Sequence, residues 1–235
     1  MTVANSKIVA DATTGTIAFT GTPAISDDIS GYNAGTTAFA DITAIAARDG
    51  DMKLTVTNAV TAAQGATIAD LTTGTVIFSG GVSDTLANLT QLNESNEPQY
   101  TNLNKIVAED GDVVITISDA AAGAALEASH LSGVGGKTTG TVTLTNARAI
   151  SGTAAEVIAA IDTAATLVVL GGTSAVTMTG TSSIANVNTI AGKATVGVVT
   201  ADVGSNTFSN LSNLTTASTD VINMTISDSA GVAEV

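Results

Sequence analysis

The sequence predicts a mainly β protein, a parallel β-solenoid of about three and a half repeats of roughly 60 residues each. Three observations support this fold class. A Thr-Thr-Gly turn followed by an apolar stretch recurs along the chain, a second strand pattern recurs between those turns, and short Ala-rich segments with helical spacing follow the strands. An array of β-α-β-α coils with the same repeats is the alternative.

The Thr-Thr-Gly turn marks the start of each repeat. It occurs at 13–15, 72–74 and 138–140, and a decayed copy follows residue 193. A fixed turn at nearly even spacing is typical of repeat architectures. We therefore expect strands in the segments 13–19, 72–78, 138–144 and 194–200.

A second type of strand is expected inside each repeat. Segments 51–58, 112–119, 174–180 and 220–228 alternate apolar residues with Thr, Ser or Lys, which is the period of a half-buried strand. The residues predicted to point inward are Leu54, Val56, Ile115, Ile117, Val176, Met178, Met224 and Ile226. If these strands stack in register, the Thr and Ser residues between them form a two-column array of hydroxyl groups.

Short helices are expected between the strands. The clearest start is Thr153, because Thr153 and Glu156 have the spacing of a capping box. Further helical segments are predicted at 62–71, 83–89, 121–131, 183–190 and 206–211. Strands separated by helices rather than by tight hairpins are expected to pair in parallel. The stretches 25–49 and 93–104 interrupt the repeat and are expected to be edge loops.

The whole chain is predicted to be one continuous array. It comprises a partial repeat at 1–12, full repeats at 13–71, 72–137 and 138–193, and a partial repeat at 194–235. Repeat arrays normally carry polar caps, and neither end of this sequence has one. We therefore expect a fragment of a longer array or a subunit that stacks on copies of itself.

Composition excludes several classes of function. The net charge is −14, from 21 acidic and 7 basic residues, so nucleic acid is not an expected partner, because phosphate contacts need Lys and Arg. Cys is absent, which excludes disulfides and thiol chemistry. No segment approaches the roughly 20 apolar residues of a membrane helix. With 44% hydrophobic but only 3% aromatic residues, the core is expected to consist of small and β-branched side chains.

Two acidic turns are candidate Ca²⁺ sites, the only cofactor that the sequence suggests. Carboxylates and turn carbonyls are ligands that Ca²⁺ uses, and the candidate ligands are Asp49, Asp51, Glu109, Asp110 and Asp112. The alternative is a plain polar turn in which Asp caps the loop and Gly supplies a positive φ.

Three motifs resemble a known group of proteins. They are Thr-Thr-Gly-x-Val, the Ile-Ser-Gly-Thr-Ala-Ala-Glu-Val segment at 150–157, and Val-x-Ile-x-Ser-Asp followed by Ala-x-x-Leu. This combination resembles the Thr/Ala-rich β-strand repeats of large bacterial surface-layer-like and adhesin-like proteins, including cyanobacterial and marine ones. The resemblance implies an extracellular location at the cell surface and a structural or adhesive role.

The expected function is therefore structural rather than enzymatic. The chain is predicted to be a repeat segment of a bacterial surface layer, fibre or giant adhesin, which acts by stiffness and by self-assembly with neighbouring repeats or copies of itself. A Ca²⁺- or carbohydrate-dependent module that binds a cell-surface glycan is the alternative. An ice-binding face and a carbohydrate-active enzyme are further alternatives, although 7 basic residues and few aromatics supply little for the latter.

Overall fold

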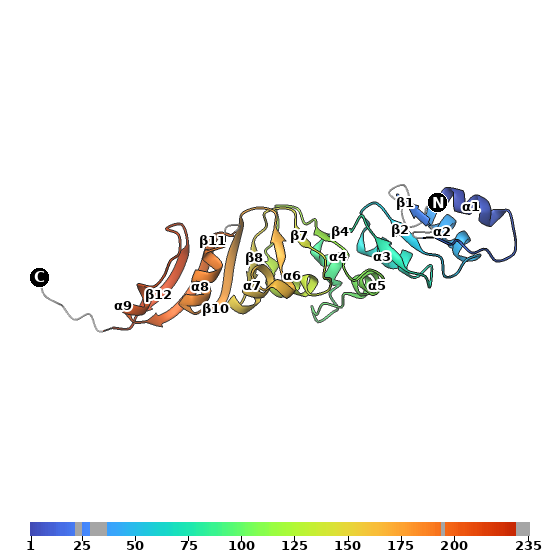
Figure 1. The fold of residues 1–235 in the computed structure, drawn as a ribbon. Coiled ribbons are helices and arrows are strands. Elements are labelled where there is room, and N and C mark those ends of the chain that lie inside the picture. Colours follow the sequence, from blue (N-terminus) through green and yellow to red (C-terminus); the bar gives the residue numbers. More distant parts are fainter. Residues whose placement is uncertain (22–24, 29–36, 194–195, 229–235) are drawn as a thin grey trace, which may run out of the picture. The chain divides into compact units, whose positions relative to one another are not determined.

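A computed structural model describes residues 1–21, 25–28, 37–193 and 196–228, and these form two compact units (Figure 1). Unit 1 comprises Met1–Ser118 and Gly136–Thr143, and unit 2 comprises Asp119–Gly135 and Leu144–Val235. Each unit consists of parallel strands accompanied by short helices.

Unit 1 contains a three-stranded parallel sheet in the order β1-β2-β3, in which Ile25, Leu54 and Val76 lie side by side. A second sheet begins with β4, which pairs in parallel with β5, and β7 follows β5. Helices pack against one another beside these sheets, α1 on α2 and α3 on α5. The elements are α1 (Val3–Asp11), β1 (Ile25–Asp27), α2 (Thr37–Ala46), β2 (Leu54–Val56), α3 (Ala62–Ala69), β3 (Val76–Phe78), β4 (Val82–Asp84), α4 (Leu86–Thr90), α5 (Thr101–Glu109), β5 (Ile115–Ile117) and most of β7 (Val142–Leu144).

Unit 2 is built on a five-stranded parallel sheet in the order β12-β11-β10-β8-β6. Helix α7 packs on α6 and on α8. The elements are β6 (Leu126–Glu127), α6 (Ala128–Gly135), β8 (Ile150–Gly152), α7 (Ala154–Ile161), the 3₁₀-helix η1 (Ala164–Thr166), β9 (Val168–Leu170), β10 (Ser174–Thr181), α8 (Ile184–Ala191), β11 (Val196–Asn206), α9 (Phe208–Leu211) and β12 (Val221–Ile226).

The predicted fold class, a mainly β parallel solenoid, is wrong. Over the part of the chain that the structure describes, 33% of the residues are helical and 25% lie in strands, and the parallel sheets are interleaved with helices. The fold is therefore α/β. The error has a physical cause. The short helices at 62–71 and after Thr153 were expected only as connections between the coils of a solenoid, and residues 37–46 were expected to lie in an edge loop. All three instead form helices with buried apolar faces that pack beside the sheets.

The four strands with an alternating pattern all form, but the last does not bury the predicted face. Met224 and Ile226 were expected to point into a core, yet they are 44% and 58% exposed. They lie on β12, which is the edge strand of its sheet and pairs only with β11 among the described residues. The predicted inward residues of β2, β5 and β10 are buried. Burial thus depends on a covering neighbour, which the alternation does not encode.

Three of the four Thr-Thr-Gly segments contain a strand within their described residues. Segments 72–78 and 138–144 contain β3 and β7, but residues 13–19 form no regular strand. The decayed copy leads into β11, and its residues 194 and 195 lie outside the described part of the chain. The expected edge loops also contain regular structure, because 25–49 includes β1 and α2, and 93–104 includes the start of α5.

Six of the described helices begin at a Ser or Thr side chain. At Thr153 the predicted capping box is present, with Glu156 accepting from the Thr153 N–H. The same cap, in which a hydroxyl oxygen accepts the N–H of the residue three positions later, occurs at Thr2, Thr61, Thr85, Thr153, Ser183 and Thr207. These caps satisfy N–H groups that a helix leaves unpaired at its start.

A carboxylate from a later strand completes several of these helix starts. Asp84 Oδ2 accepts the N–H of Ala62 at 3.0 Å at the first residue of α3. Asp27 does the same for Val3 of α1, and Asp228 for Phe208 of α9, each at 2.7 Å. Negative charge at a helix N-terminus is stabilising. Each such aspartate therefore fixes a strand end against the helix that precedes it in the chain.

The Thr-Thr-Gly corner is held by buried hydrogen bonds. Thr138 Oγ1 donates to the carbonyl of Val113 at 2.8 Å and accepts the N–H of Gly140 at 2.9 Å. Thr72 makes the equivalent bonds to Met52 and Gly74. A Cβ atom on Gly140 would lie 2.2 Å from the carbonyl oxygen of Asp112. The corner therefore needs both a short hydroxyl side chain and glycine.

We predict that Gly140→Ala lowers the free energy of unfolding by more than about 3 kcal/mol, because the new methyl group overlaps backbone that cannot move aside cheaply. Gly111→Ala is the matched control, since the nearest atom to its Cβ would be the Val107 oxygen at 3.8 Å. Its effect should stay within about 1 kcal/mol. Urea denaturation followed by circular dichroism measures both, and equal effects would contradict the close approach.

Candidate functional site

The two predicted acidic turns lie at equivalent places, one just before β2 and the other just before β5. Asp49 and Asp110 are 5% and 9% exposed. Oδ2 of Asp49 accepts the N–H of Phe19 at 2.6 Å, and Oδ2 of Asp110 accepts the N–H of Phe78 at 2.7 Å. Each buried carboxylate therefore ties its turn to the backbone of a distant segment.

Burial raises the pKa of Asp49 and of Asp110 above the ordinary value of 3.8. Asp51 and Asp112, two residues further on, raise these pKa values further by hydrogen bonding and by like charge. The N–H groups of Phe19 and Phe78 act in the opposite direction. Each buried carboxyl group therefore takes up a proton at higher pH than an exposed aspartate does.

The third predicted ligand of the second turn has a backbone partner as well. Glu109 Oε2 accepts the N–H of Val76 at 3.2 Å, so Glu109 and Asp110 both hold strand β3. Gly50 and Gly111 do not have the positive φ that a plain turn was expected to need. Among the described residues, no three or more His, Cys, Asp or Glu side chains gather in a way that could hold a metal ion.

Calcium binding at these turns stays a prediction. A cavity of about 270 Å³ borders Asp49 and Asp51, and Lys53 lines it too. The lysine charge opposes a cation there, while the two carboxylates attract one. Isothermal titration with CaCl₂ is the direct measurement.

The predicted two-column array of hydroxyl groups does not form. Strands β2 and β5, both in unit 1, belong to different sheets, and β10 and β12 belong to a third. The outward residues Thr55 and Thr116 are therefore not neighbours in one ladder. The ice-binding alternative rested on that array and loses its structural basis.

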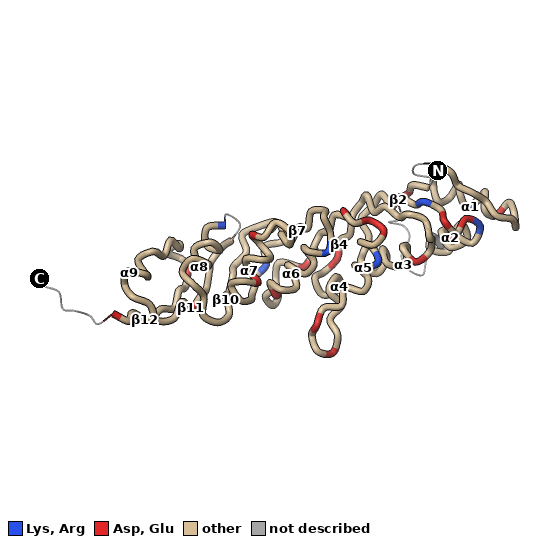
Figure 2. Tube along the Cα trace, turned by 60° about the horizontal axis from the view of Figure 1, so that its bottom comes forward, with Lys and Arg blue, Asp and Glu red and all other residues tan. Residues whose placement is uncertain are grey.

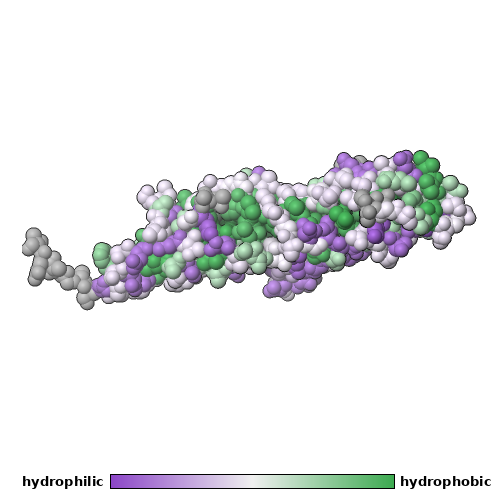
Figure 3. Space-filling model, in the orientation of Figure 1, coloured by the Kyte–Doolittle hydropathy of each residue, from purple (hydrophilic) through white to green (hydrophobic). Residues whose placement is uncertain are grey.

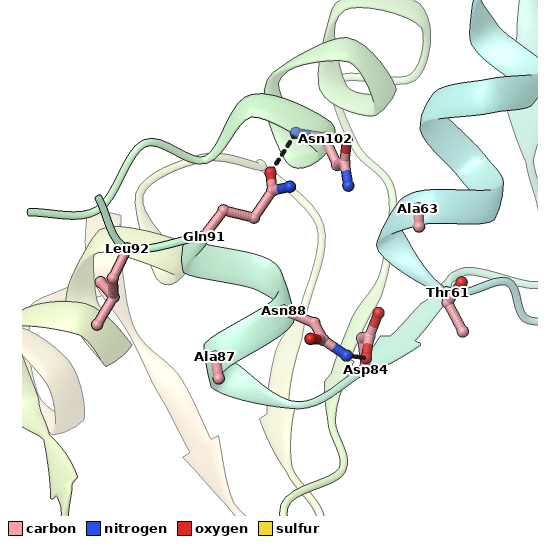
Figure 4. Close-up of a pocket in the computed structure, with 8 residues that line it drawn as sticks. All are labelled: Thr61, Ala63, Asp84, Ala87, Asn88, Gln91, Leu92 and Asn102. Atoms are coloured by element: carbon pink, nitrogen blue, oxygen red, sulfur yellow. Dashed lines mark hydrogen bonds between the residues drawn. The ribbon is translucent and has the colours of Figure 1, made fainter. Parts of the chain in front are cut away.

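A polar pocket lies in unit 1 between α3, α4 and α5 (Figure 4). Its volume is about 490 Å³, and it borders the start of two helices and the end of β4. The lining residues are Thr61, Ala63, Asp84, Ala87, Asn88, Gln91, Leu92 and Asn102. None of them was predicted as a site residue, although Asn and Gln are dense between 88 and 104. That density is the signal in the sequence that could have indicated it.

Hydrogen bonds fix the walls of this pocket. Asp84 Oδ1 accepts from the Thr85 N–H at 2.9 Å and from the Asn88 side-chain amide at 2.6 Å. Gln91 has a left-handed backbone with φ of 49°, and its Oε1 accepts the Asn102 N–H at 2.7 Å. The turn after α4 and the start of α5 are thereby held together, and the pocket is preformed.

An open strand edge is the third candidate. Strand β12 has six residues, five of which are exposed, among them Val221, Met224 and Ile226. An edge strand presents unpaired backbone N–H and C=O groups that can template pairing with another chain. Apolar side chains along such an edge favour that pairing.

Comparison with protein-family models, with curated proteins and with solved structures gives no match for this chain. Function is therefore argued from the sites alone. Within the described ranges, none of the helices has both the length and the apolar character required to span a bilayer.

We predict that Asp110→Asn raises the free energy of unfolding at neutral pH. A pKa raised in the folded state means that the parent protein gains stability as the pH falls from neutral towards 3.8. Asparagine can still accept the Phe78 N–H but does not titrate, so the difference between variant and parent should shrink over that range. Urea denaturation at several pH values measures it.

Asp110→Ala provides the contrast for this experiment. It removes the acceptor of the buried Phe78 N–H, so we expect it to be about 1–3 kcal/mol less stable than Asp110→Asn, and this difference should change little with pH because neither variant titrates at position 110. If Asp110→Asn is as damaging as Asp110→Ala at neutral pH, the ionised carboxylate is the favoured form and the argument from burial is wrong.

Proposed function

We propose that this chain is a structural, non-enzymatic segment of a bacterial extracellular surface layer, fibre or adhesin, and that it acts by stiffness and self-association. The exposed apolar edge strand β12 is the observation that supports this proposal most directly. An exposed apolar edge strand promotes unwanted pairing and aggregation in a protein that functions as a monomer. In a protein that assembles, it is an interface.

A second exposed apolar surface lies at the other terminal element of the described chain. On α1, Ile8 is 68% exposed and Val9 is 41% exposed, and Met1 precedes them. Figure 3 shows hydrophobic atoms gathered over the α1 segment. Near β12, Phe208 of α9 is 67% exposed. We name these surfaces the head (Met1, Ile8, Val9) and the tail (Phe208, Val221, Met224, Ile226). Clusters of exposed apolar residues indicate interaction surfaces, whereas single exposed apolar residues are common on any protein.

Head-to-tail contact between copies fits these two surfaces better than a two-fold dimer. A two-fold dimer through β12 would cover the tail and leave the head in water. Contact between the head of one copy and the tail of the next covers both surfaces with a single kind of interface.

Net charge opposes this association at low salt. Acidic positions are spread along both units and basic positions are few (Figure 2). Copies of a chain with a net charge of −14 repel one another, and salt screens that repulsion, with a Debye length of about 10 Å at 0.1 M. Assembly should therefore increase with ionic strength.

We predict that the parent protein assembles in a concentration-dependent manner at high salt, as measured by multi-angle light scattering and negative-stain imaging. The tail variant Met224→Lys/Ile226→Lys and the head variant Ile8→Lys/Val9→Lys should each weaken assembly by more than about tenfold, because each places charge in an apolar contact. Mixed together, the two variants should form dimers that do not grow, because only one intact head and one intact tail can meet.

Leu167→Lys/Val169→Lys is the matched control, since both residues are exposed apolar side chains outside the head and the tail. It should assemble like the parent. A parent that stays monomeric at high salt and high concentration overturns the self-association proposal. A head variant that assembles as well as the parent would instead show that the interface is not head-to-tail.

A further inference from the structure

The polar pocket of unit 1 carries hydrogen-bonding groups that the protein itself does not use. Asn102 points its side chain into the space between α3 and α4 (Figure 4). Within the described part of the chain, that side-chain amide, Gln91 Nε2 and Asn88 Oδ1 have no hydrogen-bond partner, whereas Gln91 Oε1 and Asn88 Nδ2 are engaged. Free donors and acceptors thus converge on one cavity.

The free groups of Asn88 and Gln91 are held in place by the engaged halves of the same side chains. Asn88 is fixed by its bond to Asp84, which is 7% exposed, and Gln91 by its bond to the Asn102 backbone. On the facing wall, the capping box of Thr61 with Gln64 orders the start of α3. A ligand would therefore meet groups whose conformational freedom is already restricted, which lowers the entropy cost of binding.

The chemistry of the lining excludes ions. No Lys or Arg lines the pocket, so an anion finds no charge partner. The carboxylate of Asp84 already accepts N–H groups from Ala62, Thr85 and Asn88, so it has little capacity left for a cation. What remains is a set of neutral amides that alternate donor and acceptor, together with small apolar contacts from Ala63, Ala87 and Leu92.

We propose that this pocket binds a neutral, polyhydroxylated ligand, namely a single sugar residue. Vicinal hydroxyl groups both donate and accept, which matches free carboxamide donors and acceptors placed side by side. The apolar C–H face of a sugar ring matches the alanine and leucine contacts. A volume of about 490 Å³ lies in the range of small-ligand pockets, about 300–1,000 Å³.

The expected affinity is weak, because no aromatic residue lines the pocket to stack on the ring. An assembly of many copies would still hold a glycan-covered surface by avidity. Sugar binding by one copy does not depend on self-association. The two proposals can therefore fail separately.

The test is a titration of ¹⁵N-labelled protein with methyl glycosides of glucose, galactose, mannose and N-acetylglucosamine, followed by side-chain amide and backbone shifts. At least one glycoside should cause saturable shifts at Asn88, Gln91 and Asn102 in the millimolar range. Oligosaccharides ending in the same sugar distinguish a free sugar from a glycan terminus. Glucuronate, which is charged, should bind more weakly than its neutral counterpart.

Two pocket variants and one control make the test specific. Asn102→Ala removes an unpaired amide and should weaken binding by about fivefold or more. Ala87→Leu keeps every hydrogen-bonding group but fills the cavity, and it should abolish binding while leaving the thermal midpoint unchanged, because Ala87 is exposed. Asn186→Ala is the control, since Asn186 lies in the first turn of α8 as Asn102 does in α5, and it does not line the pocket. The proposal is wrong if no glycoside gives saturable shifts, or if both pocket variants bind as the parent does.

Discussion

Side-chain oxygens of threonine and aspartate complete the backbone hydrogen bonding of this fold. Its strands and helices are short, so a large share of their N–H and C=O groups lies at element ends, where the ladder cannot pair them. Threonine caps the helices, aspartate binds helix N-termini from a later strand, and the corner residues Thr72 and Thr138 bind carbonyls of an earlier segment. Among the described residues, no buried side-chain nitrogen or oxygen lacks a partner.

This dependence explains why a chain with few charged and aromatic residues is rich in Thr, Asn and Asp. A core of Ile, Leu, Val and Ala supplies non-directional stabilisation. Hydrogen bonds from side chains to the backbone determine which strand lies beside which helix. The candidate functional surfaces lie where this pattern stops, at the outer edge of β12 and at the half-used amides of Asn88, Gln91 and Asn102.

Local features were predictable because they depend on neighbours within a few residues. The alternation that defines β2, β5, β10 and β12 and the capping box at Thr153 are of this kind. The fold class was not predictable by the same reasoning, since it depends on how the short helices pack beside the strands, and that packing involves residues far apart in the sequence. The role of Asp110 was not predictable either, because its backbone partner, Phe78, lies 32 positions away in the sequence.

The sequence by itself determined the strands β2, β5, β10 and β12, the starts of α3, α7 and α8, a core of mainly aliphatic side chains and an acidic composition, because periodicity, capping chemistry and composition are properties of the chain. Tertiary structure alone decided how the strands divide into sheets, which apolar faces stay uncovered and which amides converge on a pocket. Those properties depend on contacts between segments far apart in sequence. The same alternating pattern is therefore core in β10, where neighbouring strands and helices cover it, and open surface in β12, where nothing described does.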